Sequence, residues 1–219
     1  MAEFSGKEIQ QLCRKSKDMS EVIYLVMNKP CGYVCSAVSD SHQTVFDLLT
    51  PELQSLVQGA KRGHRLHTIG RLDSDTSGLL LFTTDGLFSH NIAANSNITK
   101  CYLAKLVKSV SPEIQPCYIE KAAAGLTLPP EKKYGEQQAE PATLHFIKDD
   151  ICEISIHEGK FHEVRRIFQA LGNEVADLKR ISIGNFKLPS DLSPGQYRKL
   201  TKDELELIHP QKEPLLYEQ

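Results

Sequence analysis

An apolar run between two polar turns, within residues 70–86 (GRLDSDTSGLLLFTTDG), constrains the fold more than any other feature of the chain. The run GLLLF has the length and composition of a buried strand, and the D-G dipeptide after it is typical of a turn. Asp73 and Asp75 lie in the loop directly before the run. We therefore predict a buried strand with an acidic loop at its start.

Strand patterns and short helical patterns are interspersed along the rest of the chain. Residues 22–30 are rich in β-forming side chains, residues 98–110 alternate between apolar and polar, and residues 142–159 have the pattern of a hairpin. Helical spacing occurs over residues 44–58 and most clearly over residues 160–173. Because apparent hairpins are frequent, we predict an α+β fold with a mixed sheet rather than an alternating parallel sheet.

The composition excludes several classes of protein. The chain has 219 residues, of which 40% are hydrophobic and 25% charged, as in ordinary globular proteins. It contains no run close to the roughly 20 apolar residues of a membrane span, and its start lacks the apolar centre of a signal peptide. The six cysteines form no C-x-x-C pair, so we expect free thiols and no zinc ribbon. These features predict a cytoplasmic protein that does not enter a membrane.

The formal net charge of −2 does not indicate a partner, but the charges are unevenly distributed. Residues 61–71 contain four basic side chains and no acid, and residues 160–180 contain five basic side chains against three acids. Such asymmetry fits a basic cleft on a nearly neutral protein, as nucleic-acid binding requires. It fits solvated surface charge equally well, so the charge pattern leaves both interpretations open.

Acidic loops of this kind occur in three kinds of site, and the chain departs from the pattern of the first two. A calcium-binding EF-hand that starts at Asp73 needs a bidentate Glu at its twelfth position, where the chain has Thr84. A haloacid-dehalogenase-type phosphatase loop would read D-x-D-x-T, whereas Thr76 comes one place early. In a purely structural turn, Asp73 or Asp75 would cap backbone amides, and the loop alone does not exclude this.

The acidic loop resembles the active-site loop of pseudouridine synthases, specifically the bacterial ribosomal small-subunit-type (RsuA-like) family. The family signature G-R-L-D-x-D-T-x-G-L-L-L-x-T-x-D-G is matched throughout. Lys100 and Tyr102 match the family's K-x-Y motif. The likeness covers roughly residues 22–208 and includes further motifs in their usual order, at residues 25–36, 140–145, 156–184 and 192–205.

The resemblance implies a mixed, mostly antiparallel sheet with flanking helices and a central cleft. Residues 21–210 would form the catalytic domain, after a polar leader at 1–20 and before a tail at 211–219. The implied activity is the isomerisation of a uridine in ribosomal RNA, with no cofactor and no metal. The implied partner is ribosomal RNA or a pre-ribosomal particle, and we expect a monomer.

The resemblance also assigns roles to side chains. Asp73 would be the nucleophile, and Arg165 would pair with it and keep it ionised. The ring of Tyr102 would stack on the flipped uracil, and Leu178 would press on the other face of the base. RNA contacts, mostly to phosphate, are expected from Arg71, Lys29, Arg166, Lys179 and Arg180. Asp75 and Asp85 would be structural.

Two departures from the family pattern bear on these expectations. Glu163 stands where the family usually has Gln, which adds a negative charge beside the expected RNA cleft. The residues before the first motif do not resemble the S4 RNA-binding domain of many relatives. Either this member lost that domain or the chain is incomplete. The overall likeness favours small-subunit RNA as the substrate, and the missing S4 domain favours large-subunit RNA.

A protein of another class would share this fold, namely a non-catalytic RNA-binding or ribosome-assembly factor. Binding alone would not require an acid, a tyrosine and an arginine at the three motif positions. The presence of Asp73, Tyr102 and Arg165 therefore favours an enzyme.

Overall fold

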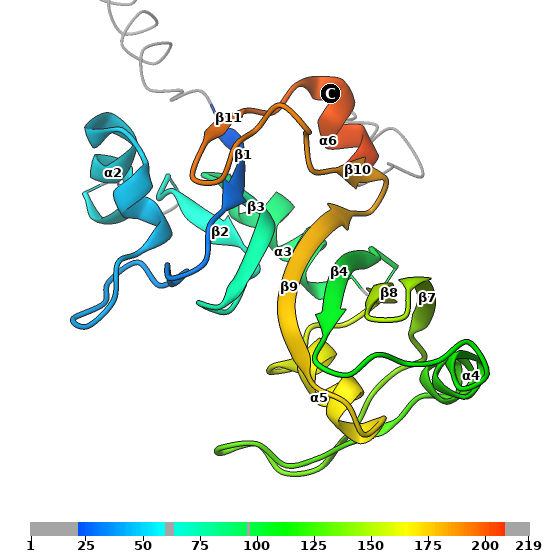
Figure 1. Ribbon diagram of the computed structural model, residues 1–219. Helices are drawn as coiled ribbons and strands as arrows, with labels where there is room; N and C mark the ends of the chain where they lie inside the picture. Colours follow the sequence, from blue (N-terminus) through cyan, green and yellow to red (C-terminus); the bar gives the residue numbers. More distant parts are fainter. Residues whose placement is uncertain (1–21, 60–63, 96, 209–219) are drawn as a thin grey trace, which may run out of the picture.

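A nine-stranded sheet forms the centre of the protein, whose computed structural model describes residues 22–59, 64–95 and 97–208 (Figure 1). Its strands are β1 (Tyr24–Lys29), β2 (His67–Ile69), β3 (Thr76–Thr83), β4 (Lys100–Leu106), β7 (Thr143–Lys148), β8 (Ile151–Ile156), β9 (Val175–Ile183), β10 (Phe186–Lys187) and β11 (Tyr197–Lys199). Two short strands, β5 (Thr127–Leu128) and β6 (Gln137–Gln138), pair separately.

The helices are short and lie between the strands. They are the 3-10 helix η1 (Val45–Leu48), α2 (Pro51–Gln58), α3 (Gly86–Ala94), α4 (Gln115–Ala124), α5 (Glu163–Ala170) and α6 (Lys202–Ile208). None of the helices within the described ranges is long and apolar enough to cross a membrane.

The strand order makes β9 the link between two groups of strands. The order is β11-β1-β3-β9-β4-β8-β7, with β2 added beside β3 and β10 beside β9. In Figure 1, β9 runs between the group of β1 to β3 and the group of β4, β7 and β8. All pairs are antiparallel except β3 with β9. The prediction of a mixed, mostly antiparallel sheet in an α+β fold is thereby confirmed.

The apolar run of the first motif forms the interior strand β3, as predicted. Side chains alternate along a strand, so successive leucines enter cores on opposite faces of the sheet. Leu80 and Phe82 belong to the core beneath η1 and α2, whereas Leu79 and Leu81 belong to the core that includes Ile208 of α6. All four side chains are fully buried. β3 is thus covered on both faces, which makes the loop at its start a rigid place for a functional group.

The helix predicted over residues 160–173 begins later than expected. The structure has a turn at residues 161–162 and starts α5 at Glu163. The apolar stripe is confirmed, because Val164, Ile167 and Phe168 are buried. His162 has a left-handed backbone with φ of 49°, which stops the helix from extending backwards. The expected leader at 1–20, the tail at 211–219 and part of the basic stretch lie outside the described residues.

Candidate active site

A cavity of about 500 Å³ opens where β3 and β9 run parallel. Six of the nine side chains expected at the site line it, and they come from four separate segments of the chain. These are Arg71, Asp73, Tyr102, Arg165, Leu178 and Arg180. Lys29, Arg166 and Lys179 do not line this cavity.

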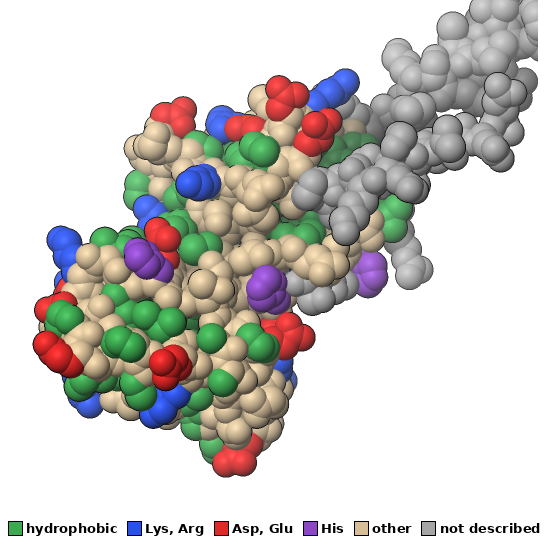
Figure 2. All heavy atoms as spheres, turned by 90° about the vertical axis from the view of Figure 1, so that its right-hand side faces the viewer, with side chains coloured by type: hydrophobic (Ala, Val, Ile, Leu, Met, Phe, Trp, Pro, Cys, Tyr) green, Lys and Arg blue, Asp and Glu red, His purple; other side chains and the backbone are tan. Residues whose placement is uncertain are grey.

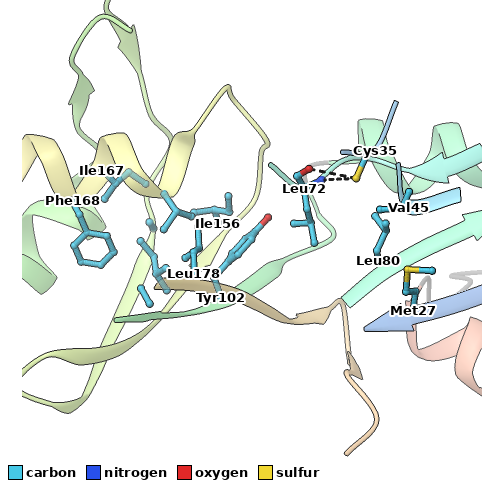
Figure 3. Close-up of a cluster of buried hydrophobic side chains, with 14 of the residues drawn as sticks. Met27, Cys35, Val45, Leu72, Leu80, Tyr102, Ile156, Ile167, Phe168 and Leu178 are labelled. Atoms are coloured by element: carbon cyan, nitrogen blue, oxygen red, sulfur yellow. Dashed lines mark hydrogen bonds between the residues drawn. The ribbon is translucent and has the colours of Figure 1, made fainter. Parts of the chain in front are cut away.

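The cavity has an apolar wall built from adjacent strands. Tyr102 and Leu178 are 8% and 3% exposed, and Figure 3 shows them side by side with Ile156. Because β4 pairs with β9, with Ala104 opposite Leu178, the two side chains project from the same face of the sheet. This arrangement offers a flat ring and an aliphatic side chain at the inner end of the cavity.

Asp73 is positioned by the residue before it and by the backbone around it. Leu72 is buried, and its backbone N–H and carbonyl both bond to the thiol of Cys35 at 3.4 Å (Figure 3). Burial raises the pKa of Cys35, so the sulfur remains a thiol that can donate and accept. The side chain of Asp73 is 38% exposed at the cavity.

Arg180 presents an unpaired donor at the cavity. Its Nε donates to the carbonyl of Leu79 at 2.8 Å, which holds the guanidinium against β3. Its Nη2 is buried and has no hydrogen-bond partner among the described residues, although the residue lines the cavity and is only 3% exposed. A buried guanidinium N–H without a partner is costly, so this atom indicates a place for a ligand acceptor. Arg71, by contrast, is exposed at the rim.

A family model described as RNA pseudouridylate synthase matches residues 23–170. The chain belongs to this family. The ribosomal small subunit pseudouridine synthase A of Escherichia coli K12 is 38% identical over 183 residues, which cover 83% of this chain and 72% of that protein. An uncharacterised RNA pseudouridine synthase of Bacillus subtilis, YtzG, is 38% identical over 198 residues, or 88% of this chain and 75% of that protein.

Solved structures give the same result for the fold. A crystal structure of a pseudouridylate synthase superposes with a TM-score of 0.73 at 36% identity and covers 87% of this chain and 75% of that chain. A chain of a Cbf5-Nop10-Gar1 complex has a TM-score of 0.50 at 18% identity, covering 76% and 49%, and shares the fold alone. The resemblance inferred from the motifs is confirmed: the chain is a pseudouridine synthase.

The charge partner of Asp73 in this synthase differs from the predicted one. The guanidinium of Arg165 pairs with Asp75 at 2.9 Å and also donates to the carbonyl of Val175 at 3.0 Å. Among the described residues, the ion-pair partner of Asp73 is His162, whose Nε2 lies 3.6 Å from Oδ1. Asp75 is therefore structural, as predicted, but through an ion pair rather than an amide cap. Asp85 does cap helix α3 through the N–H groups of Leu87 and Phe88.

Lys29 supports the loop of Asp73 from below and is too deeply buried to contact phosphate. It is 0% exposed, and its ammonium donates to the carbonyls of Asp73 at 3.0 Å and Thr76 at 2.8 Å. Burial lowers the pKa of Lys29. The expectation that this lysine binds RNA is replaced by a structural role, because its donors are used by the backbone on both sides of the loop.

Replacing Lys29 with Met should loosen this loop. The carbonyls of Asp73 and Thr76 would lose their buried donor, which should lower the free energy of unfolding by about 1–3 kcal/mol. The rate of catalysis should fall about tenfold or more, because a displacement of 1 Å at a reacting group is costly. Urea unfolding and single-turnover kinetics would measure the two effects. Unchanged stability together with an unchanged rate would contradict the role of Lys29.

Arg166 and Lys179 also differ from their predicted RNA contacts. Arg166 is 0% exposed and donates to the carbonyls of Pro129 and Gly135 and to the side chain of Gln137. Its location leaves no surface for a phosphate. Lys179 lies between Leu178 and Arg180 on β9, so its side chain projects from the opposite face of the sheet. It lines a different depression, away from Asp73.

Sequence reasoning gave no role to three charged side chains that line the cavity, Lys100, Lys160 and Glu163. Glu163 does not add an exposed charge: it is 4% exposed and accepts the backbone N–H of Lys160 at 2.8 Å. Burial raises its pKa, against the effects of that hydrogen bond and of Lys160 and Lys100. Burial and the nearby Arg180 lower the pKa of Lys100. Only the folded structure reveals these neighbours, because they come from different strands and loops.

The surface away from the cavity does not collect basic side chains on the face shown in Figure 2, where acidic, basic and hydrophobic groups are interspersed. That face lies on the side of β7 and α4 in Figure 1. The lysine and arginine side chains that line the cavity are Arg71, Lys100, Lys160, Arg165 and Arg180.

Proposed function

We propose that this synthase converts a specific uridine of small-subunit ribosomal RNA into pseudouridine, with Asp73 as the nucleophile. The observation that carries the proposal is the meeting of Asp73, Tyr102, Leu178 and the unpaired Nη2 of Arg180 in one cavity. Relatives at 36–38% identity that are named small subunit pseudouridine synthases support the choice of RNA. We further propose that it acts in the cytoplasm as a monomer.

The reaction requires little besides a shaped pocket. The N1–C1′ bond of the uridine breaks, the base turns, and a C5–C1′ bond forms, while the proton lost from C5 is balanced by one gained at N1. No co-reactant is consumed. The base must leave its stack to reach the acid, and a cavity of about 500 Å³ accommodates a flipped nucleotide. Asp73 would attack the sugar C1′ or the base C6, or assist the formation of a glycal.

The walls of the cavity suit a uracil ring. Tyr102 supplies an aromatic face on which a base stacks, and Leu178 supplies an apolar contact beside it. Arg180 would donate from its unpaired Nη2 to a carbonyl oxygen of the flipped base rather than to a phosphate, because it is almost fully buried. Arg71, which is exposed at the rim, would contact the RNA outside the cavity.

Replacing Arg180 with Met should lower kcat/KM for RNA about 10- to 100-fold, the effect expected from losing one charge-assisted hydrogen bond. Steady-state kinetics on ribosomal RNA would measure it. Lys187→Met is a matched control, because Lys187 is an exposed base on β10 outside the cavity. An Arg180→Met protein with normal stability and normal kcat/KM would contradict the contact.

Mapping of pseudouridine in ribosomal RNA tests the proposed function directly. Cells that lack the protein should lose pseudouridine at one position of the small-subunit RNA, and the wild-type gene should restore it. Loss at a position of the large-subunit RNA would correct the substrate but keep the activity. If no position changes although ribosome assembly is impaired, the protein is a non-catalytic assembly factor and the proposal is wrong.

A further inference from the structure

Three side-chain rings stack on one another in the cavity that contains Asp73. Tyr134 stacks on Phe161 with ring centroids 4.7 Å apart, and Phe161 stacks on His162 at 3.9 Å. All three line the cavity. His162 is one of only two described non-glycine residues with positive φ, the other being Lys132 in the same cluster. A non-glycine residue persists in this backbone conformation only where its surroundings hold it, and such residues concentrate at functional sites.

His162 lies between two carboxylates. Its Nδ1 is 2.8 Å from Oε1 of Glu131, and its Nε2 is 3.6 Å from Oδ1 of Asp73. An ionised carboxylate only accepts hydrogen bonds, so the contact with Glu131 places a proton on Nδ1. Nε2 then faces Asp73 favourably when it too carries a proton.

The loop that supplies Glu131 is anchored from beneath by Arg166. This β5–β6 loop, residues 129–136, is closed by mutual backbone hydrogen bonds between Glu131 and Tyr134 at 2.8 and 2.9 Å. The buried guanidinium of Arg166 donates to the carbonyls of Pro129 and Gly135, near the two ends of the loop. Helix α5 therefore carries Arg166, which anchors the loop, and follows directly after His162, which the loop contacts.

We propose that His162, oriented by Glu131, is the positioning residue that holds the Asp73 carboxylate directed into the cavity. This inference rests on the proposed role of Asp73. Since Arg165 is paired with Asp75, the imidazole is the basic group that the described structure places beside the nucleophile. The β5–β6 loop thereby becomes part of the active site, although it contributes no residue to the family motifs that carried the resemblance.

The test uses full-length protein and ribosomal RNA as the probe. His162→Asn keeps one donor and tolerates the left-handed backbone, and Glu131→Gln keeps an acceptor without the charge. Each should lower the single-turnover rate about 10- to 100-fold, as the loss of a charge-assisted contact predicts. RNA affinity, measured by filter binding, should stay within about twofold, because neither side chain is proposed to bind RNA. His145→Asn, on the exposed face of β7, should behave as wild type.

A double-mutant cycle separates positioning from general structural support. If Glu131 acts through His162, the double variant should be no slower than His162→Asn alone. If the rate losses of the two single variants multiply in the double variant, Glu131 does not act through His162. Wild-type rates in both single variants would overturn the proposal. A defect seen only in RNA affinity would also overturn it, because His162 would then contact RNA.

Nitrogen NMR of histidine-labelled protein gives a readout that does not depend on turnover. We expect Glu131→Gln to shift the Nδ1 resonance of His162, because this nitrogen lies 2.8 Å from the Glu131 carboxylate. An Nδ1 resonance that does not respond to Glu131→Gln would overturn the inference. If the proposed function itself is wrong, wild-type protein would form no pseudouridine in any ribosomal RNA. The NMR result would still show whether His162 contacts Glu131.

Discussion

Asp73→Asn should abolish pseudouridine formation without unfolding the protein. The amide has the shape of the carboxylate but cannot act as a nucleophile, and loss of a nucleophile lowers kcat on the order of 10⁴-fold or more in other enzymes. The side chain is 38% exposed and makes only the 3.6 Å contact with His162 among the described ion pairs, so little stability depends on it. The loop itself is held by Leu72 and Lys29, which the substitution leaves unchanged.

Single-turnover conversion of ribosomal RNA, followed by quantification of pseudouridine, would measure this effect. Asp40→Asn is the matched control, because Asp40 is an exposed loop acid away from the cavity. Urea unfolding should give the same midpoint for both variants and the wild type. Restoration of the modification by Asp73→Asn in cells that lack the protein would remove Asp73 from its proposed role.

Gly78→Ala should be the most destabilising small substitution in the site region. Gly78 has φ of 100° and lies opposite Arg180 in the parallel pair of β3 and β9. A Cβ atom there would come within 2.2 Å of the carbonyl oxygen of Arg180. The neighbour is backbone, so it cannot rotate away, and the strands would have to separate. We expect the free energy of unfolding to fall by about 3 kcal/mol or more from the clash and the strained φ together.

Denaturant unfolding measures this loss, and Gly86→Ala provides the comparison. Gly86 is the first residue of α3, and a Cβ atom there would meet nothing within 4 Å. That variant should match or slightly exceed the wild type in stability, since Ala is the better helix former. Equal stability of the two variants would show that β3 and β9 do not approach as closely as the structure has them. Because this junction supports Asp73 and Arg180, Gly78→Ala should also lose activity.

Local patterns in the chain were sufficient for most elements of the fold. The apolar run of β3 and the hairpin of β7 and β8 depend on near neighbours, and both were predicted. The start of α5 was missed, because the left-handed backbone of His162 accompanies contacts with the carboxylates of Asp73 and Glu131, which come from distant segments.

The residues of the site also divide into those that local motifs identified and those that only contacts between distant segments revealed. The sequence alone, through its motifs, determined the family and directed attention to Asp73, Tyr102 and Leu178, which do line one cavity. It could not tell a buried base from an exposed one, because burial is set by packing between segments far apart in the chain. Only the tertiary structure decided that Lys29 and Arg166 hold backbone carbonyls and that Arg165 pairs with Asp75. It also decided that His162 stands beside Asp73, because a charge partner is fixed by distance in space rather than by spacing in sequence.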